Sequence, residues 1–262
     1  MKLVKIGLMA ILATVTAIAF SETPDEAAVK KVIEVRLGDS LKVLSVQKTP
    51  FGGLYEIRTT NDILYTDVKG DYLFSGHVLD TKTRKDFTRD RLEEISRIDF
   101  SDLPLEFALK MVKGNGKRVI AVFEDPNCGY CKHLRKTLSE MQNVTVYTFM
   151  YNILAPDSAV KSRNIWCSNH HAKAWDDWML DGKLPATAPE KCIAPNDKVL
   201  ALGQKVGVNS TPTIFFTDGT RGVGAPDINA LEAKLASVKE IKSPAYAKAI
   251  NYLKDRYIEL SQ

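Results

Sequence analysis

The sequence predicts a protein of mixed α and β structure, α+β in its first part and α/β in its second. Its 262 residues exceed the usual single domain of about 100–200 residues, which favours two domains. Short apolar segments separated by turn residues fill residues 42–80, and a strand–helix–strand pattern occupies residues 119–150. Hydrophobic residues make up 45% and charged residues 26%, which excludes a disordered or multi-spanning chain. The net charge of +4 gives no reason to expect a nucleic acid partner.

The first 21 residues are typical of a secretory signal peptide. Lys2 and Lys5 give a positive start, residues 6–20 are mostly apolar, and Ala19-Phe20-Ser21 has the small residues of a cleavage site. The apolar run is about 15 residues, shorter than the roughly 20 that span a bilayer, so an uncleaved anchor is the weaker alternative. We therefore expect export, with a mature chain that begins near residue 22.

Residues 22–83 are predicted to form a small N-terminal domain. A helix is expected over residues 24–37, because Thr23 can cap it, Pro24 suits its first turn and Gly38 stops it. Four short strands with turn residues between them are expected next, at Val43–Val46, Leu54–Arg58, Ile63–Thr66 and Tyr72–Phe74. A charged, helix-compatible segment then predicts a linker helix within residues 84–103.

A second domain is predicted over residues 104–240, and it begins with a β-α-β unit. The continuous apolar run Val119–Phe123 indicates a strand buried on both faces. Asn127 can cap a helix that runs from about Cys128 to Met141. The alternating segment Val144–Met150 predicts the next strand, so a C-x-x-C motif lies at the first turn of the helix.

The rest of this domain is predicted to be helical and then β-rich. A helical region is expected from about Ser158 to Val206, and a last helix begins near Asp227. Asp218-Gly219 is a strong hairpin signal between two strands, expected at Thr213–Phe216 and Thr220–Val223. This order is that of a thioredoxin-like domain with a helical insertion, followed by a C-terminal extension of residues 241–262.

Cys128-Gly129-Tyr130-Cys131 points to thiol–disulfide exchange. That reaction needs a thiolate, an electrophilic disulfide and a second thiol that resolves the mixed disulfide. The unpaired N–H groups and the positive dipole end of a helix N-terminus stabilise negatively charged sulfur. We therefore predict that Cys128, the more exposed thiol, attacks, and that Cys131, one turn further on the apolar face, resolves.

Other uses of the motif are weaker. A four-cysteine zinc site usually pairs one C-x-x-C with a second close pair, but Cys167 and Cys192 are 25 positions apart. Haem attachment needs C-x-x-C-H, whereas Lys132 follows Cys131 here. A purely structural disulfide within the motif is a third, minor alternative. No metal and no bound cofactor are predicted.

Residues near the motif receive secondary predictions. Glu124 and Asp125 precede it and could carry protons. A solvated helix face is expected to hold Lys132, His133, Arg135 and Lys136. The core is expected to hold Trp166, Trp175 and Trp178, and the surface His170 and His171.

Cys128-Gly129-Tyr130-Cys131 together with Ser210-Thr211-Pro212-Thr213 resembles the DsbC/DsbG family of bacterial periplasmic disulfide isomerases. The segment Ile165-Trp166-Cys167, the later Cys192 and the strand-rich N-terminal domain are also similar to that family. The likeness covers nearly the whole chain after the signal peptide, up to about Val238.

The resemblance implies a cystatin-like dimerisation domain, a structural Cys167–Cys192 disulfide, and a cis peptide before Pro212 that lets Thr211 bind an extended substrate. It also implies a V-shaped periplasmic homodimer, kept reduced by the membrane protein DsbD, which holds misfolded secreted proteins and isomerises their wrong disulfides. A lone N-terminal domain of about 60 residues is near the limit for a stable core, which also favours dimerisation.

Four functions therefore remain open. The expected one is isomerisation of disulfides in secreted proteins. A dithiol oxidase or a reductase of the same fold would have the same motif as an isomerase and would differ from it in reduction potential. A holdase chaperone would bind unfolded clients without using its cysteines.

Overall fold

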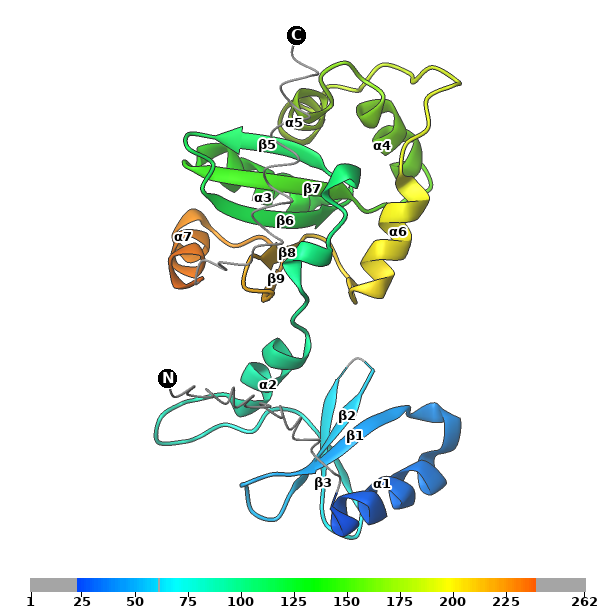
Figure 1. Ribbon diagram of the computed structural model, residues 1–262, viewed down its shortest axis with the longest axis vertical. Helices are drawn as coiled ribbons and strands as arrows, with labels where there is room; N and C mark the ends of the chain where they lie inside the picture. Colours follow the sequence, from blue (N-terminus) through cyan, green and yellow to red (C-terminus); the bar gives the residue numbers. More distant parts are fainter. Residues whose placement is uncertain (1–22, 61, 239–262) are drawn as a thin grey trace, which may run out of the picture. The chain divides into compact units, whose positions relative to one another are not determined.

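The computed structural model describes residues 23–60 and 62–238, and they form two compact units that divide between Leu79 and Asp80 (Figure 1). The expected signal peptide and C-terminal extension lie outside the described residues. Within those residues, no helix is both long and apolar enough to cross a membrane.

The first unit is a helix packed on a four-stranded antiparallel sheet. Helix α1 (Pro24–Leu37) begins at a capping box, in which Thr23 and Glu26 each bond the other's backbone N–H, and ends at Gly38. The strands are β1 (Val43–Lys48), β2 (Tyr55–Thr59), β3 (Ile63–Thr66) and β4 (Leu73–Ser75), in spatial order β1-β2-β3-β4. Its core is formed by Val29, Ile33, Val43, Val46, Tyr55 and Ile57. All five predicted elements are confirmed, with small shifts of their ends.

The second unit contains a five-stranded mixed sheet. The strands are β5 (Leu109–Lys113), β6 (Arg118–Glu124), β7 (Val144–Met150), β8 (Thr213–Phe216) and β9 (Arg221–Val223), in order β5-β7-β6-β8-β9. Only β6 and β7 are parallel, and helix α3 (Gly129–Glu140) connects them. This is the predicted β-α-β unit of a thioredoxin-like domain, with the C-x-x-C at the carboxyl end of β6.

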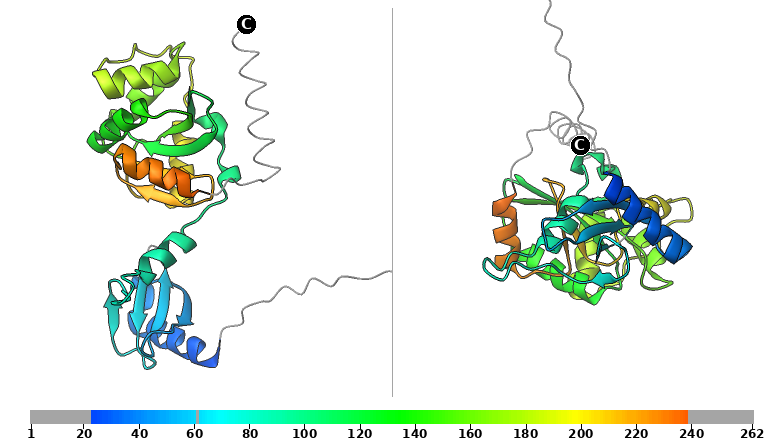
Figure 2. Two further views of the ribbon diagram at one scale, coloured as in Figure 1. Left: turned by 90° about the vertical axis from the view of Figure 1, so that its left-hand side faces the viewer. Right: turned by 90° about the horizontal axis from the view of Figure 1, so that it is seen from below.

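Helices cover both faces of this sheet (Figure 1, Figure 2). Ile120 and Val122 of β6 pack on one face with α3 and with α7 (Ile228–Ser237). Ala121 and Phe123 point to the other face, where they pack with α6 (Asn196–Lys205). Side chains alternate between the faces of a strand, so a strand covered on both sides is apolar throughout.

The helical insertion consists of α4 (Ser158–Trp166), α5 (His171–Asp181) and α6. Residues 182–195 between α5 and α6 are not helical, so the predicted helical region is interrupted. Gly182, at φ 68°, ends α5 in the left-handed conformation that favours glycine. Prolines then keep the following residues out of a helix, at Pro185, Pro189 and Pro195.

The linker helix α2 (Phe87–Ile95) belongs to the second unit. Two hydrogen bonds attach the residues that follow it: Ile98 N–H donates to the Gly219 carbonyl (3.1 Å), and Arg221 Nη2 donates to the Ser96 carbonyl (2.7 Å). The helix is shorter than the predicted linker of residues 84–103, and a 3-10 turn (Phe100–Asp102) follows it within that range. A second 3-10 turn (Leu105–Phe107) and strand β5 lie before β6, where the sequence predicted no element.

Candidate active site

Cys128 and Cys131 are both free thiols at the start of α3. The N-cap of this helix is Cys128 itself, not Asn127 as the sequence predicted, because the Cys128 sulfur takes the place of a capping oxygen. The Cys131 backbone N–H donates to Cys128 Sγ across 3.1 Å. An unpaired N–H of the first helical turn therefore points at the sulfur, which stabilises negative charge there.

The two thiols differ little in exposure. Cys131 is fully buried and Cys128 is 4% exposed, so Cys128 is the more accessible sulfur by a narrow margin. Between them, Gly129 and Tyr130 are exposed, and Tyr130 is 73% exposed. A Cβ at position 129 would meet no atom within 4 Å, so packing does not require glycine there. The surface above the buried thiols is therefore formed by a small and an aromatic residue.

Thr211 lies opposite Cys128. The peptide bond between Thr211 and Pro212 is cis, and the Cys128 thiol donates to the Thr211 carbonyl across 3.4 Å. This segment directly precedes β8, the neighbour of β6 in the sheet. The fold thus joins residues that are 83 positions apart in the sequence.

The two acidic residues before the motif have different environments. The Asp125 carboxylate accepts hydrogen bonds from the backbone N–H groups of Asn127 (2.8 Å), Ile153 (2.8 Å) and Leu154 (3.0 Å) and from Ser158 Oγ (2.9 Å). It therefore ties the turn before Cys128 to the segment after β7. This role has a weak sequence signal, because an aspartate before proline is common in turns.

Glu124 is fully buried, and neither of its carboxylate oxygens has a hydrogen-bond partner among the described residues. Burial raises its pKa from 4.5 to about 7, against the opposing effect of the Arg135 charge. Trp175 and Thr148 also favour the charged form, although neither reaches the carboxylate in normal hydrogen-bond geometry. The Glu124 carboxyl group can therefore exchange its proton near neutral pH.

The predicted basic face of α3 is only partly solvated. His133 and Lys136 are exposed, and Lys132 is half-buried with its ammonium 4.9 Å from the Trp178 ring centre. Arg135 is buried, contrary to the prediction, and its Nε pairs with Asp176 of α5. It is buried because its position on α3 faces α5 rather than solvent. Helical periodicity cannot reveal a neighbouring helix that comes from elsewhere in the chain.

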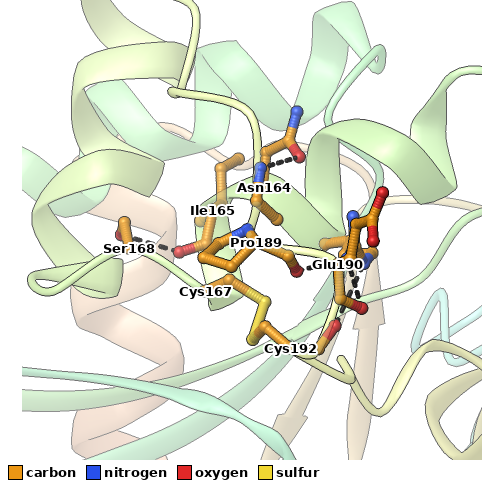
Figure 3. Close-up of a disulfide and its surroundings, with 9 residues drawn as sticks. Asn164, Ile165, Cys167, Ser168, Pro189, Glu190 and Cys192 are labelled. Atoms are coloured by element: carbon orange, nitrogen blue, oxygen red, sulfur yellow. Dashed lines mark hydrogen bonds between the residues drawn. A yellow bond between two sulfur atoms is a disulfide. The ribbon is translucent and has the colours of Figure 1, made fainter.

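Cys167 and Cys192 are joined by a disulfide, with a Cα–Cα distance of 6.1 Å (Figure 3). Both residues are half-buried. The Arg163 side chain donates to three carbonyls of the Cys192 loop, those of Cys192 (3.1 Å), Pro189 (2.6 Å) and Glu190 (3.2 Å). The loop is therefore attached to α4 by a covalent bond and by an arginine.

Burial differs from the prediction at one of the three tryptophans and at one of the two histidines. Trp175 is fully buried and Trp178 nearly so, whereas Trp166 is half-buried. His170 is exposed, but His171 is half-buried and stacks on Trp166 with ring centroids 5.7 Å apart.

Two families match this chain. Residues 105–239 match a thioredoxin-like domain, and residues 20–89 match the disulfide bond isomerase protein N-terminal domain. The chain is 50% identical over 212 residues to the "Probable thiol:disulfide interchange protein DsbC" of Bordetella pertussis, covering 81% of this chain and 75% of that protein. It is 32% identical over 203 residues to the "Thiol:disulfide interchange protein DsbC" of Dickeya dadantii, covering 75% and 80%.

Two further comparisons match parts of the chain. The Escherichia coli K12 "Thiol:disulfide interchange protein DsbC" is 27% identical over 201 residues, covering 75% of this chain and 81% of that protein. Among solved structures, a disulfide interchange protein from Neisseria gonorrhoeae is 41% identical, with a TM-score of 0.49, over 51% of this chain and 96% of that one.

Proposed function

Because the chain belongs to the DsbC family of thiol:disulfide interchange proteins, we propose that Cys128 and Cys131 are its redox-active pair and that it isomerises wrong disulfides in secreted proteins. The observation that carries this proposal is the position of Cys128. Its sulfur caps α3, receives the Cys131 N–H and faces the Thr211 carbonyl, while its partner thiol lies one helical turn away.

The reaction begins with the thiolate of Cys128. It attacks one sulfur of a substrate disulfide, forms a mixed disulfide and releases the other substrate sulfur as a thiolate. In isomerisation, a second substrate thiolate then attacks the mixed disulfide, forms a new substrate disulfide and returns Cys128 as a thiolate. The substrate gains no net electrons in this sequence, and the enzyme must start reduced because only a free Cys128 thiolate can attack.

Cys131 resolves a mixed disulfide that does not rearrange within the substrate. Its thiolate attacks Cys128 Sγ, forms the Cys128–Cys131 disulfide and releases the substrate reduced by two electrons. Cys131 must first lose its proton, and burial followed by the negative charge of Glu124 raises its pKa. The unpaired Glu124 carboxylate is the nearby group that can take up this proton, because its own pKa is about 7.

Thr211 and Pro212 are proposed to bind the substrate, with Gly129 and Tyr130 above the thiols. A cis peptide presents the backbone of Thr211 beside Cys128, where an extended peptide can bond to it as a strand would. Exposed Tyr130 adds an apolar contact next to the reacting sulfur.

The N-terminal unit is proposed to form the homodimer. Strand β4 ends the sheet order, and all three of its residues are exposed. Tyr72, Leu73 and Phe74 present apolar side chains along this edge, at 70%, 39% and 52% exposure. Pairing two such edges across a two-fold axis would bury these side chains and satisfy the edge backbone groups. A cleft between the two catalytic domains would then hold misfolded clients, as a chaperone does.

The remaining proposals follow from the family. The domains are proposed as a signal peptide (1–21), a dimerisation domain (22–83), a linker (84–103), a catalytic domain (104–240) and a C-terminal extension (241–262). Export by the signal peptide would place the enzyme in the periplasm, where DsbD would keep it reduced. The Cys167–Cys192 disulfide is proposed to be structural.

A refolding assay with a scrambled disulfide substrate tests the proposed function. Reduced wild-type protein should restore substrate activity catalytically, and Cys128→Ala should not. Equal recovery with Cys128→Ala would favour a holdase that does not use this thiol. Conversion of a reduced substrate to its oxidised form, without reshuffling, would favour an oxidase instead.

A further inference from the structure

The type of turn in front of Cys128 depends on the orientation of one peptide group. The Cys128 backbone N–H donates to the Asp125 carbonyl across 3.0 Å, so residues 125–128 form a β-turn with Pro126 and Asn127 at its centre. Proline at the second position of a turn suits both type I and type II. These two types differ by a flip of the central peptide, which here is the bond between Pro126 and Asn127.

Both ends of that central peptide are bound. Its N–H, from Asn127, donates to the Asp125 carboxylate across 2.8 Å. Its carbonyl, from Pro126, accepts the indole Nε1–H of Trp178 across 2.7 Å. Trp178 is on α5 of the helical insertion, 52 positions further along the chain. A flip of the peptide would break both hydrogen bonds at once.

The turn is in the conformation that these two bonds select. Among the described residues, positive φ outside glycine occurs only at Arg84 and Asn143, so Asn127 has a negative φ. A type II turn requires a positive φ at this third position, which asparagine tolerates better than most residues. Asp125 provides one of the two selecting bonds from within the turn, and Trp178 provides the other from elsewhere in the fold.

Trp178 is itself held in place. Two lysine ammonium groups lie over its ring, those of Lys132 (4.9 Å) and Lys161 (4.6 Å to the ring centre). Lys161 Nζ also donates to Asn127 Oδ1 (2.5 Å), so α4 and α5 both reach the centre of the turn. Trp178 is 9% exposed, which keeps water away from its hydrogen bond with Pro126.

We propose that Trp178 is a positioning residue for Cys128, which acts by fixing the peptide between Pro126 and Asn127 in one orientation. This inference rests on the proposed role of Cys128 as the attacking thiol. In the reduced protein, non-covalent contacts with the Cys131 N–H and the Thr211 carbonyl hold this sulfur in place. The stability of the reduced form therefore depends on where the sulfur lies. The disulfide form is constrained by its own covalent bond. Loss of the Trp178 hydrogen bond should therefore destabilise the reduced form more than the oxidised form.

The test is the substitution Trp178→Phe, with Trp166→Phe as the matched control. Both substitutions remove an indole N–H from the helical insertion, but Trp166 is on α4 and its ring stacks on His171. For Trp178→Phe we expect the redox equilibrium with glutathione to shift about three- to tenfold toward the Cys128–Cys131 disulfide, as loss of one hydrogen bond allows. The kcat for isomerisation should fall several-fold with KM unchanged, because Trp178 does not reach the substrate. Trp166→Phe should match wild type in both measurements.

A second variant separates the loss of the N–H group from any misfolding caused by the smaller phenylalanine ring. Replacing Trp178 with β-(3-benzothienyl)alanine keeps the bicyclic ring and exchanges only the N–H for sulfur, and it should reproduce the shift of Trp178→Phe. If both Trp178 variants keep the wild-type equilibrium and kcat, or change only KM or the melting temperature, Trp178 is not a positioning residue. Wild type and Cys128→Ala are assayed in parallel, because equal turnover by these two would overturn the proposed function and not this inference alone.

Discussion

Glu124 and Cys131 are both completely buried, and burial followed by the negative charge of Glu124 raises the pKa of the Cys131 thiol above its usual 9.0. A thiol in this state reacts only if a neighbouring group takes its proton. The pKa of Glu124, raised by burial to about 7, places that group in the required range.

Glu124→Gln should therefore slow resolution without slowing attack. We expect release of substrate from the mixed disulfide by Cys131 to fall at least about a hundredfold, the low end of the effect of a general base. Initial formation of the mixed disulfide at Cys128 should be unchanged. Stopped-flow kinetics with a peptide disulfide would separate the two steps. Glu140→Gln, on the exposed end of α3, is the control. Equal slowing of both steps in Glu124→Gln would contradict this role.

The same carboxyl group should make stability depend on pH. Between pH 4.5 and about 7 the unfolded chain has lost the Glu124 proton, whereas the folded protein keeps it. The free energy of unfolding should therefore fall as pH rises through this window, by up to about 3 kcal/mol. Urea unfolding of the reduced protein measures this slope, and Glu124→Gln should flatten it. An unchanged slope in the variant would assign the pH dependence to other groups.

The Cys167–Cys192 disulfide should stabilise the catalytic domain without taking part in turnover. It closes a loop with a sequence separation of 25 residues, for which chain entropy alone predicts about 3.5 kcal/mol. Cys167→Ala with Cys192→Ala should lower the melting temperature, while the folded fraction keeps its exchange rate. Mass mapping of alkylated cysteines during graded reduction gives a second readout. Trapping of Cys131 bonded to Cys167 would show instead that the second pair relays electrons.

Arg163 should act as a second attachment of the same loop. Arg163→Met removes its hydrogen bonds to the carbonyls of Pro189, Glu190 and Cys192, at a cost of about 1–2 kcal/mol while the disulfide is intact. The cost should be larger in the protein without the disulfide, because the loop is then attached to α4 only by the Arg163 hydrogen bonds and by the bond from the Ala188 N–H to Asn164 Oδ1 (2.8 Å). A double-mutant cycle from urea unfolding measures this coupling, with exposed Lys191→Met as control. Strictly additive effects would show that the two attachments are independent.

Phe74→Lys should weaken the homodimer. A charge in the centre of β4 would oppose burial of this edge against a second copy. Sedimentation velocity at micromolar concentration should show a dimer for wild type and a shift to monomer for the variant, with Leu44→Lys on β1, at the opposite edge of the sheet, as control. A wild-type protein that sediments as a monomer would remove the cleft from the proposed mechanism.

The sequence predicted those elements whose signals are local. Thr23 and Pro24 marked the start of α1, and β7 was predicted with its observed ends because Val144–Met150 alternates clearly. Strand β5 was missed because Leu109–Lys113 is short, carries two lysines and is defined by pairing with β7. The burial of Arg135 depends on Asp176 of another helix, and the link between Trp178 and Pro126 crosses 52 positions. Such contacts leave no periodic pattern in a single sequence.

Trapping the mixed disulfide shows whether Cys128 is the attacking thiol. Cys131→Ala removes the thiol that resolves this intermediate, so reduced Cys131→Ala mixed with a scrambled substrate should accumulate a covalent complex. Mass mapping should place the substrate on Cys128, and Cys128→Ala should form no such complex. A substrate found on Cys131 of the Cys128→Ala protein at the same rate, or on neither cysteine, would contradict the account.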